Sequence, residues 1–209
     1  MTTVQELNKY KFYLFIDKSG SMSTNDCDGG KSRWDSVQES TKAIAEKINK
    51  LSNGGGINII TFNNSIKIYA DTTPDKVDQI FVENEPMGGT SPDKALKVMF
   101  DDYFTQKAAG TAKPVIGLVV TDGEPSSEED KNNLTKLIVD SANKMDADEE
   151  IGISFFQVGK DPDATKFLQF LDDNLVSVLG AKFDIVDTKK MTDLENMSLT
   201  DAIMEAIKD

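Results

Sequence analysis

The stretch "FIDKSGSMS", residues 15–23, decides how the whole sequence is interpreted. It begins inside Lys11–Asp17, "KFYLFID", in which a continuous run of apolar and aromatic residues ends in an aspartate. Such a run is typical of a strand that is buried on both faces. Ser19 and Ser21 follow the aspartate at alternate positions. The sequence therefore predicts a carboxylate and two hydroxyls gathered at the end of a buried strand.

Strand and helix patterns alternate along the rest of the chain. The segments "INIITF" and "IKIYAD" flank three polar residues, which predicts a hairpin. We found no internal repeat and no low-complexity linker. The alternation predicts a single doubly wound, Rossmann-like α/β domain over residues 1–209, with a mostly parallel central sheet, one antiparallel edge strand and helices on both faces.

The other expected elements follow from apolar periodicity and from residues that begin or end helices. In chain order they are a helix from Trp34 to Leu51 ended by the glycines of Ser52–Gly56, a short helix from Pro74 to about Phe81, a helix from Pro92 to about Phe104 capped by Ser91, a strand over Pro114–Asp122, a helix with a capping box from Ser126 to Glu129, a strand over Ile151–Gly159, a helix over Asp163–Asn174, a short strand over Phe183–Asp187 and a helix over Ser198–Asp209.

Composition limits the possible partners and the compartment. The chain has 209 residues with a formal net charge of −13, so it lacks the basic surface that nucleic acids or anionic membranes require. Its lone cysteine, Cys27, cannot form an internal disulfide. The first residues show no signal-peptide pattern, and no apolar run approaches the roughly 20 residues of a membrane span. We expect a cytoplasmic protein; the sequence does not indicate its oligomeric state.

The chain contains no histidine, the commonest side chain for acid–base catalysis and for binding transition metals. Any site must therefore use oxygen ligands, lysine or the lone cysteine. In doubly wound sheets, ligands bind outside the carboxyl ends of the strands, where the strand order reverses. If the two buried strands that end in "FID" and "TDGE" are neighbours, five side chains can meet there: Asp17, Ser19, Ser21, Asp122 and, from the loop "GGTS", Thr90.

These five side chains are hard oxygen donors without nitrogen or sulfur. That set suits Mg²⁺, with Mn²⁺ or Ca²⁺ as alternatives, rather than zinc or copper. Two carboxylates neutralise a divalent ion, and the hydroxyls donate only weakly. The ion therefore remains able to take one more anionic ligand.

The segments "DKSGSMS", "GGTS" and "VVTDGEP" together resemble the metal-ion-dependent adhesion site of the von Willebrand factor type A domain family. The resemblance implies that Ser19, Ser21 and Thr90 bind the metal directly, and that Asp17 and Asp122 act largely through bound water. It also implies a binding module whose open coordination position takes a carboxylate from a protein partner. Many prokaryotic members are intracellular, and we interpret this chain as one of them.

Two other functions remain open at this stage. One is a Mg²⁺-dependent phosphotransferase or hydrolase with Asp17 as nucleophile, but the second aspartate that such enzymes carry two residues later is Ser19 here. Neither a P-loop nor a G-x-G-x-x-G turn appears, and without histidine the serines lack the usual base. The other alternative is a structural domain with a vestigial site. We predict a binding module that is not an enzyme.

The loop Thr24–Arg33 carries part of a calcium-loop spacing, but a threonine stands at the position of its first aspartate. We interpret the loop as a polar turn that rims the metal site. Cys27 lies in it between Asp26 and Asp28, whose charges should raise the thiol pKa and keep the thiol unreactive. Trp34 begins the apolar stripe of the next helix, so we expect it in the core.

Overall fold

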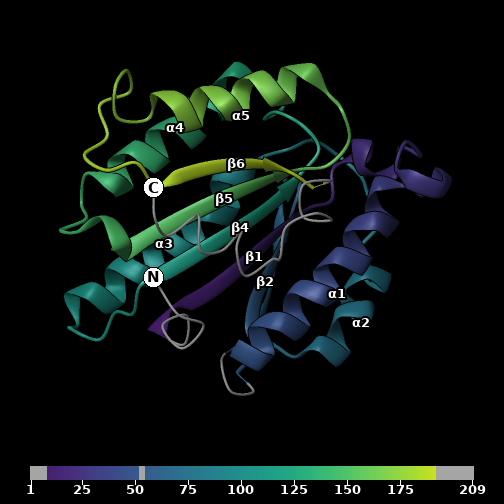
Figure 1. Cartoon of the computed structure of the whole chain (residues 1–209), viewed down its shortest axis with the longest axis horizontal. Coiled ribbons are helices and arrows are strands. Elements are labelled where there is room, and N and C mark those ends of the chain that lie inside the picture. Colours follow the sequence, from purple (N-terminus) through teal and green to yellow (C-terminus); the bar gives the residue numbers. More distant parts are fainter. Residues whose placement is uncertain (1–8, 52–54, 192–209) are drawn as a thin grey trace.

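The computed structural model describes residues 9–51 and 55–191, in which one sheet lies between two layers of helices (Figure 1). The elements run β1 (Lys11–Asp17), α1 (Arg33–Leu51), β2 (Ile57–Phe62), β3 (Ile66–Thr72), α2 (Val77–Val82), α3 (Pro92–Ala108), β4 (Val115–Thr121), α4 (Glu128–Ala142), β5 (Ile151–Gln157), α5 (Pro162–Asn174) and β6 (Val186–Lys190).

The strand order is β3-β2-β1-β4-β5-β6. Every neighbouring pair is parallel except β2 and β3, which form the expected hairpin at one edge. From β1 the chain moves outward to β2 and β3, then returns to the other side of β1 as β4. The order therefore reverses between β1 and β4, where ligands bind in this class of sheet. The predicted fold class is confirmed.

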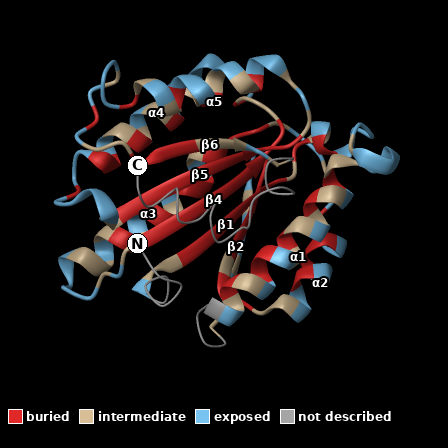
Figure 2. Ribbon diagram, in the orientation of Figure 1, coloured by how far each residue is buried: buried red, intermediate tan, exposed pale blue. Residues whose placement is uncertain are grey.

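Both faces of the sheet are buried, which explains why the central strands are apolar throughout. In β1, Phe12, Leu14 and Ile16 pack into a core with α1 and α2, whereas Tyr13 and Phe15 pack into a second core with α3, α4 and α5. Figure 2 shows the central strands β1, β4 and β5 as a buried layer between partly exposed helices, whereas the edge strand β3 is mostly exposed. This packing fixes β1 tightly, and with it the position of the polar residues that follow.

The helix α1 is held against the same face by aromatic packing. Trp34 is buried, and its ring lies 4.5 Å from that of Phe81 in α2, centroid to centroid. Met22, just beyond β1, is fully buried in the same core. The expected core position of Trp34 is confirmed, and the loop between β1 and α1 is anchored at both ends.

Two predicted elements have wrong boundaries. The helix α3 continues to Ala108 rather than ending near Phe104. The last described strand is Val186–Lys190 rather than Phe183–Asp187, because parallel pairing with β5 extends to Lys190. Main-chain pairing at this edge does not require apolar side chains, so hydropathy misplaced the strand. The predicted helix over 198–209 and part of the glycine stop at 52–56 lie outside the described residues.

The predicted caps of two helices also need correction. Ser127, not Ser126, caps α4, because its hydroxyl accepts a hydrogen bond from the Asp130 N–H at 3.1 Å. The serines are adjacent and each has an acidic residue three positions later, so the pattern fits both registers. Ser91 stands at the N-cap of α3 as expected, with Pro92 in the first turn, but its side chain makes no capping hydrogen bond.

Candidate metal centre

The candidate site lies where β1 and β4 end side by side. Ile16 pairs with Val120 in the parallel register, so the residues that follow each of them emerge together. Asp17 is fully buried, and Asp122 is 1 % exposed. The two carboxylates can share one rim only if their strands are neighbours. The pairing of β1 with β4 meets this condition.

Hydrogen bonds connect four of the five predicted ligands into one cluster. Asp17 accepts from the Ser19 N–H at 2.7 Å through Oδ1 and from the Thr121 hydroxyl at 2.6 Å through Oδ2. The Ser19 and Ser21 hydroxyl oxygens lie 3.0 Å apart. The Ser21 hydroxyl donates to Oδ1 of Asp122 at 2.9 Å. The alternating serines thus place two hydroxyls between the two aspartates.

The fifth residue, Thr90, lies in a loop held against this cluster. The Gly20 N–H donates to the Gly88 carbonyl at 3.0 Å, which joins the loop to the turn after β1. The Thr90 N–H donates to the Ser126 hydroxyl at 2.6 Å, and the Ser126 N–H donates to the Thr90 carbonyl at 3.1 Å. Thr90 is buried, but the hydrogen bonds that join the other four residues do not include it. Ser126, predicted as a helix cap, instead positions Thr90.

The electrostatics of the cluster centre on Asp17. Burial raises the pKa of Asp17 to about 7, and the nearby charge of Asp122 adds to this, while hydrogen bonds from Thr121 and Ser19 act in the opposite direction. Two ionised carboxylates that are buried near each other raise the free energy of the folded state unless cations or hydrogen-bond donors compensate their charges. The cluster therefore has a built-in preference for a bound positive charge.

One such charge comes from Arg33, which sequence reasoning did not assign to the site. Its Nη1 donates to Oδ2 of Asp122 at 2.7 Å. Nε and Nη2 donate to the two carboxylate oxygens of Asp26, at 2.9 and 2.6 Å. Arg33 and Asp122 are 89 positions apart in the chain. No local pattern joins them, because the contact exists only through the order of the strands.

The loop 24–33 does rim the site, as predicted. Its Asp28–Gly30 segment forms a short 3-10 turn, and Asp26 is engaged by Arg33. The thiol pKa of Cys27 is raised, as expected, but mainly because the side chain is half-buried and less because of Asp26 and Asp28. Cys27 is therefore partly covered although both of its neighbours in the chain are charged.

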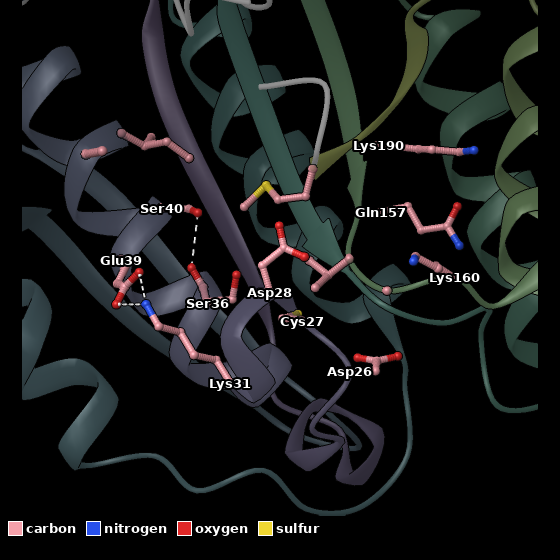
Figure 3. A pocket seen from close by; sticks show the side chains of 15 residues that line it. Asp26, Cys27, Asp28, Lys31, Ser36, Glu39, Ser40, Gln157, Lys160 and Lys190 are labelled. Carbon is pink, nitrogen blue, oxygen red and sulfur yellow. Dashed lines mark hydrogen bonds and ion pairs between the residues drawn. The ribbon is translucent and has the colours of Figure 1, made fainter. Parts of the chain in front are cut away.

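A cavity of about 410 Å³ adjoins this loop. Figure 3 shows Asp26, Cys27 and Asp28 on one side of it, with Gln157, Lys160 and Lys190 from the ends of β5 and β6 opposite. Because it borders the Asp26–Arg33 pair, movement of the loop would change its shape.

The donor set fits a hard divalent cation and no softer metal. Among residues 9–51 and 55–191, no group of three Asp, Glu or Cys side chains is arranged to hold a metal ion. A cation here must use the hydroxyls as well as the two aspartates, and Ser21 is exposed to solvent beside them. Hydroxyl and carboxylate oxygens are ligands that Mg²⁺ and Mn²⁺ accept.

A family model places the chain among known proteins. The model for the von Willebrand factor type A domain matches residues 12–124, more than half of the chain, and this range includes all five candidate ligands. The chain belongs to the von Willebrand factor type A domain family. Domains of this family are known as protein-interaction or adhesion modules. No curated protein sequence matches the chain.

Solved structures share the fold of this von Willebrand factor type A domain at low sequence identity. The conserved hypothetical protein BatB from Bacteroides thetaiotaomicron is 16% identical, with a TM-score of 0.60 over 96% of this chain and 100% of its own. The pilus adhesin SpaC from Lactobacillus rhamnosus GG is 14% identical, with a TM-score of 0.61 over 96% of this chain and 31% of its own. Manganese-loaded TRAP from Plasmodium vivax is 15% identical, with a TM-score of 0.55 over 89% of this chain and 70% of its own.

Within the part of the chain that the structure describes, every helix is too short or too polar to cross a lipid bilayer.

Proposed function

We propose that this von Willebrand factor type A domain is a Mg²⁺-dependent protein-binding module. The observation that carries the proposal is the hydrogen-bonded cluster of Ser19, Ser21 and Asp122 beside the buried carboxylate of Asp17. Mn²⁺ or Ca²⁺ would suit the same oxygens. The manganese-loaded state of the TRAP structure supports the same class of metal for this fold.

In this proposal each residue has a separate role toward the metal. The hydroxyls of Ser19, Ser21 and Thr90 bind it directly. Asp17 and Asp122 neutralise its charge from behind, largely through bound water. Because the hydroxyls add no charge, the ion retains affinity for an anionic ligand. We propose that a protein partner supplies this ligand as a glutamate or aspartate side chain.

We further propose that the domain catalyses no reaction. Asp17, the candidate nucleophile of the alternative phosphotransferase, is fully buried and accepts a hydrogen bond at each carboxylate oxygen. A nucleophile must contact its substrate, and the buried carboxylate of Asp17 exposes no surface for that contact. Assays with phosphoesters and nucleotides in Mg²⁺ are expected to show no turnover; turnover that is lost in Asp17→Asn would contradict the binding-module proposal.

Metal binding itself is tested most directly by thermal unfolding. With a dissociation constant of about 1 mM, about 10 mM Mg²⁺ stabilises the folded state by roughly 1.4 kcal/mol through mass action. For a domain of this size we expect the melting temperature to rise by about 3–6 °C.

The matched variants for this experiment are Ser21→Ala and Ser23→Ala. Ser21 belongs to the cluster, whereas Ser23, two positions further on, bonds only the Gly20 carbonyl among the residues described. We expect the Mg²⁺-dependent shift to shrink in Ser21→Ala and to persist in Ser23→Ala. A melting temperature that none of the three cations moves would refute the metal site.

The single-domain organisation, the cytoplasmic location and the assignment to the prokaryotic intracellular members stay predictions of the sequence. Fractionation of cells that express the tagged protein tests the location. Limited proteolysis tests the domain organisation, because a single domain should yield one resistant core.

A further inference from the structure

The side chain of Arg33 bridges two carboxylates and is only 11% exposed. One edge of its guanidinium engages both oxygens of Asp26 in the loop 24–33, and Nη1 engages Asp122 at the end of β4. Bidentate arginine–carboxylate pairs are strong and have a fixed geometry. The loop 24–33 is thereby tied to a carboxylate of the candidate metal site.

The surrounding backbone is shaped to accept this guanidinium. Gly159, just after β5, has a φ of +74°, and a Cβ built on it would lie 2.6 Å from Nε of Arg33 and 2.8 Å from its Cζ. Only glycine combines that backbone conformation with so close an approach. Arg33 therefore occupies a built position between Asp26, Asp122 and Gly159, and is not a surface side chain that happens to reach an aspartate.

Both oxygens of Asp122 are engaged, Oδ2 by Arg33 and Oδ1 by Ser21. A divalent cation at this site brings a second positive charge to Asp122 and therefore competes with Arg33 for the same negative charge. The hydroxyl of Ser21 can turn toward the cation and remain in place as a ligand. The guanidinium cannot, because it has no acceptor and carries a charge of the same sign.

We propose that Arg33 is the resident counter-ion of Asp122, and that it competes with the divalent cation for this carboxylate. Cation binding then releases Arg33 from Asp122 and loosens the loop 24–33, which changes the cavity beside the site. The inference rests on the proposed function, since it concerns the same metal site. By linkage, if cation binding raises the affinity of the released loop for a partner, that partner raises the affinity of the site for the cation by the same factor.

The first test measures the affinity for Mn²⁺ by titration calorimetry in the full chain. Arg33→Gln is expected to bind Mn²⁺ about tenfold more tightly than wild type, within the roughly 5–150-fold range of ordinary coupling energies. A merely structural role would predict weaker binding. Lys31→Gln is the matched control, because it removes a cation of the same loop that pairs with Glu39 and not with Asp122. We expect Lys31→Gln to bind within about twofold of wild type.

Arg33→Lys separates the bridge from the charge. A lysine keeps the positive charge but cannot bind Asp26 bidentately while it holds Asp122. We expect its Mn²⁺ affinity to lie between those of wild type and Arg33→Gln. It also serves as the second variant if Arg33→Gln fails to fold.

The second test follows the loop through Cys27, the only cysteine in the chain. Cys27 is half-buried and lines the cavity next to Asp26. The rate of its modification by a maleimide should increase several-fold when Mn²⁺ is added to wild type. In Arg33→Gln, the rate should be high without metal and insensitive to it, because the bridge is already broken.

The outcomes separate this inference from the proposed function. Equal Mn²⁺ affinity in wild type, Arg33→Gln and Arg33→Lys, or a Cys27 modification rate that Mn²⁺ leaves unchanged in wild type, overturns the inference and leaves the metal site standing. Failure of both wild type and the Arg33 variants to bind Mn²⁺ refutes the metal site and the inference together. If Arg33→Gln binds Mn²⁺ and wild type does not, the result supports the inference that Arg33 competes with the cation for Asp122.

Discussion

Removal of Mg²⁺ by a chelator is expected to weaken binding of the protein partner at least about 30-fold. Breaking a desolvated contact between a charged group and its counter-charge costs about 2–5 kcal/mol, and 2 kcal/mol corresponds to roughly 30-fold in affinity. In the proposed complex the metal makes that contact with a partner carboxylate. The measurement is the affinity for a partner that copurifies in Mg²⁺, repeated in EDTA and again after Mg²⁺ is restored.

The variants for this measurement remove single hydroxyls while leaving the two aspartates in place. Thr90→Val retains the size and branching of the side chain, and Ser21→Ala removes an exposed hydroxyl of the cluster. We expect both to weaken partner binding in Mg²⁺, with Ser23→Ala unchanged. Neutralising one acidic residue of the partner should have the same effect as EDTA. Equal affinities with and without EDTA would exclude the metal as the contact and direct attention to the loop 24–33.

The second large effect is a dependence of stability on pH that originates at Asp17. Its pKa is about 7 in the folded protein, against 3.8 for an ordinary aspartate. Between these two values the folded state binds more protons than the unfolded state, so the free energy of unfolding falls as the pH rises. The fall amounts to about 4 kcal/mol for this carboxyl and is complete slightly above pH 7.

Denaturant unfolding in EDTA from pH 4 to 8 measures this effect, and Asp17→Asn should lose most of the slope. Asp172 is the matched control, because burial raises its pKa to about 6 at a place away from the site, and Asp172→Asn should remove a smaller slope of the same sign. Mg²⁺ favours the ionised form of Asp17 and should restore stability at pH 8. Parallel pH profiles for wild type and Asp17→Asn would contradict the burial of a titrating carboxyl here.

Most of the fold could be predicted because its causes are local. The strand Lys11–Asp17 is apolar from Phe12 to Ile16 without interruption, which is typical of a strand that is covered on both faces. The hairpin and the alternation of strands with helices then leave few topologies. The boundaries that failed, at α3 and β6, depend on main-chain pairing and helix continuation, to which hydropathy is insensitive.

The candidate site divides in the same way. Asp17, Ser19 and Ser21 lie within five consecutive residues, so the sequence alone determined that they share one turn. The placement of Asp122 beside them required β1 and β4 to be neighbours, which the sequence could state only as a condition. Ser126 shows what a local pattern cannot predict. Its spacing to Glu129 fits a helix cap, but in the structure its hydroxyl accepts a hydrogen bond from the Thr90 N–H.

The sequence by itself therefore determined the layered α/β fold, the hard oxygen donors and the absence of histidine chemistry, because these depend on composition and on short spacings. Only the tertiary structure decided the charge balance of the site. Asp26, Arg33 and Asp122 meet because the strand order brings the end of β4 beside the start of α1. The pKa of Asp17 likewise depends on burial between two strands and on a carboxylate more than a hundred positions away. Such Coulombic effects follow distance in space, which no local pattern in the chain encodes.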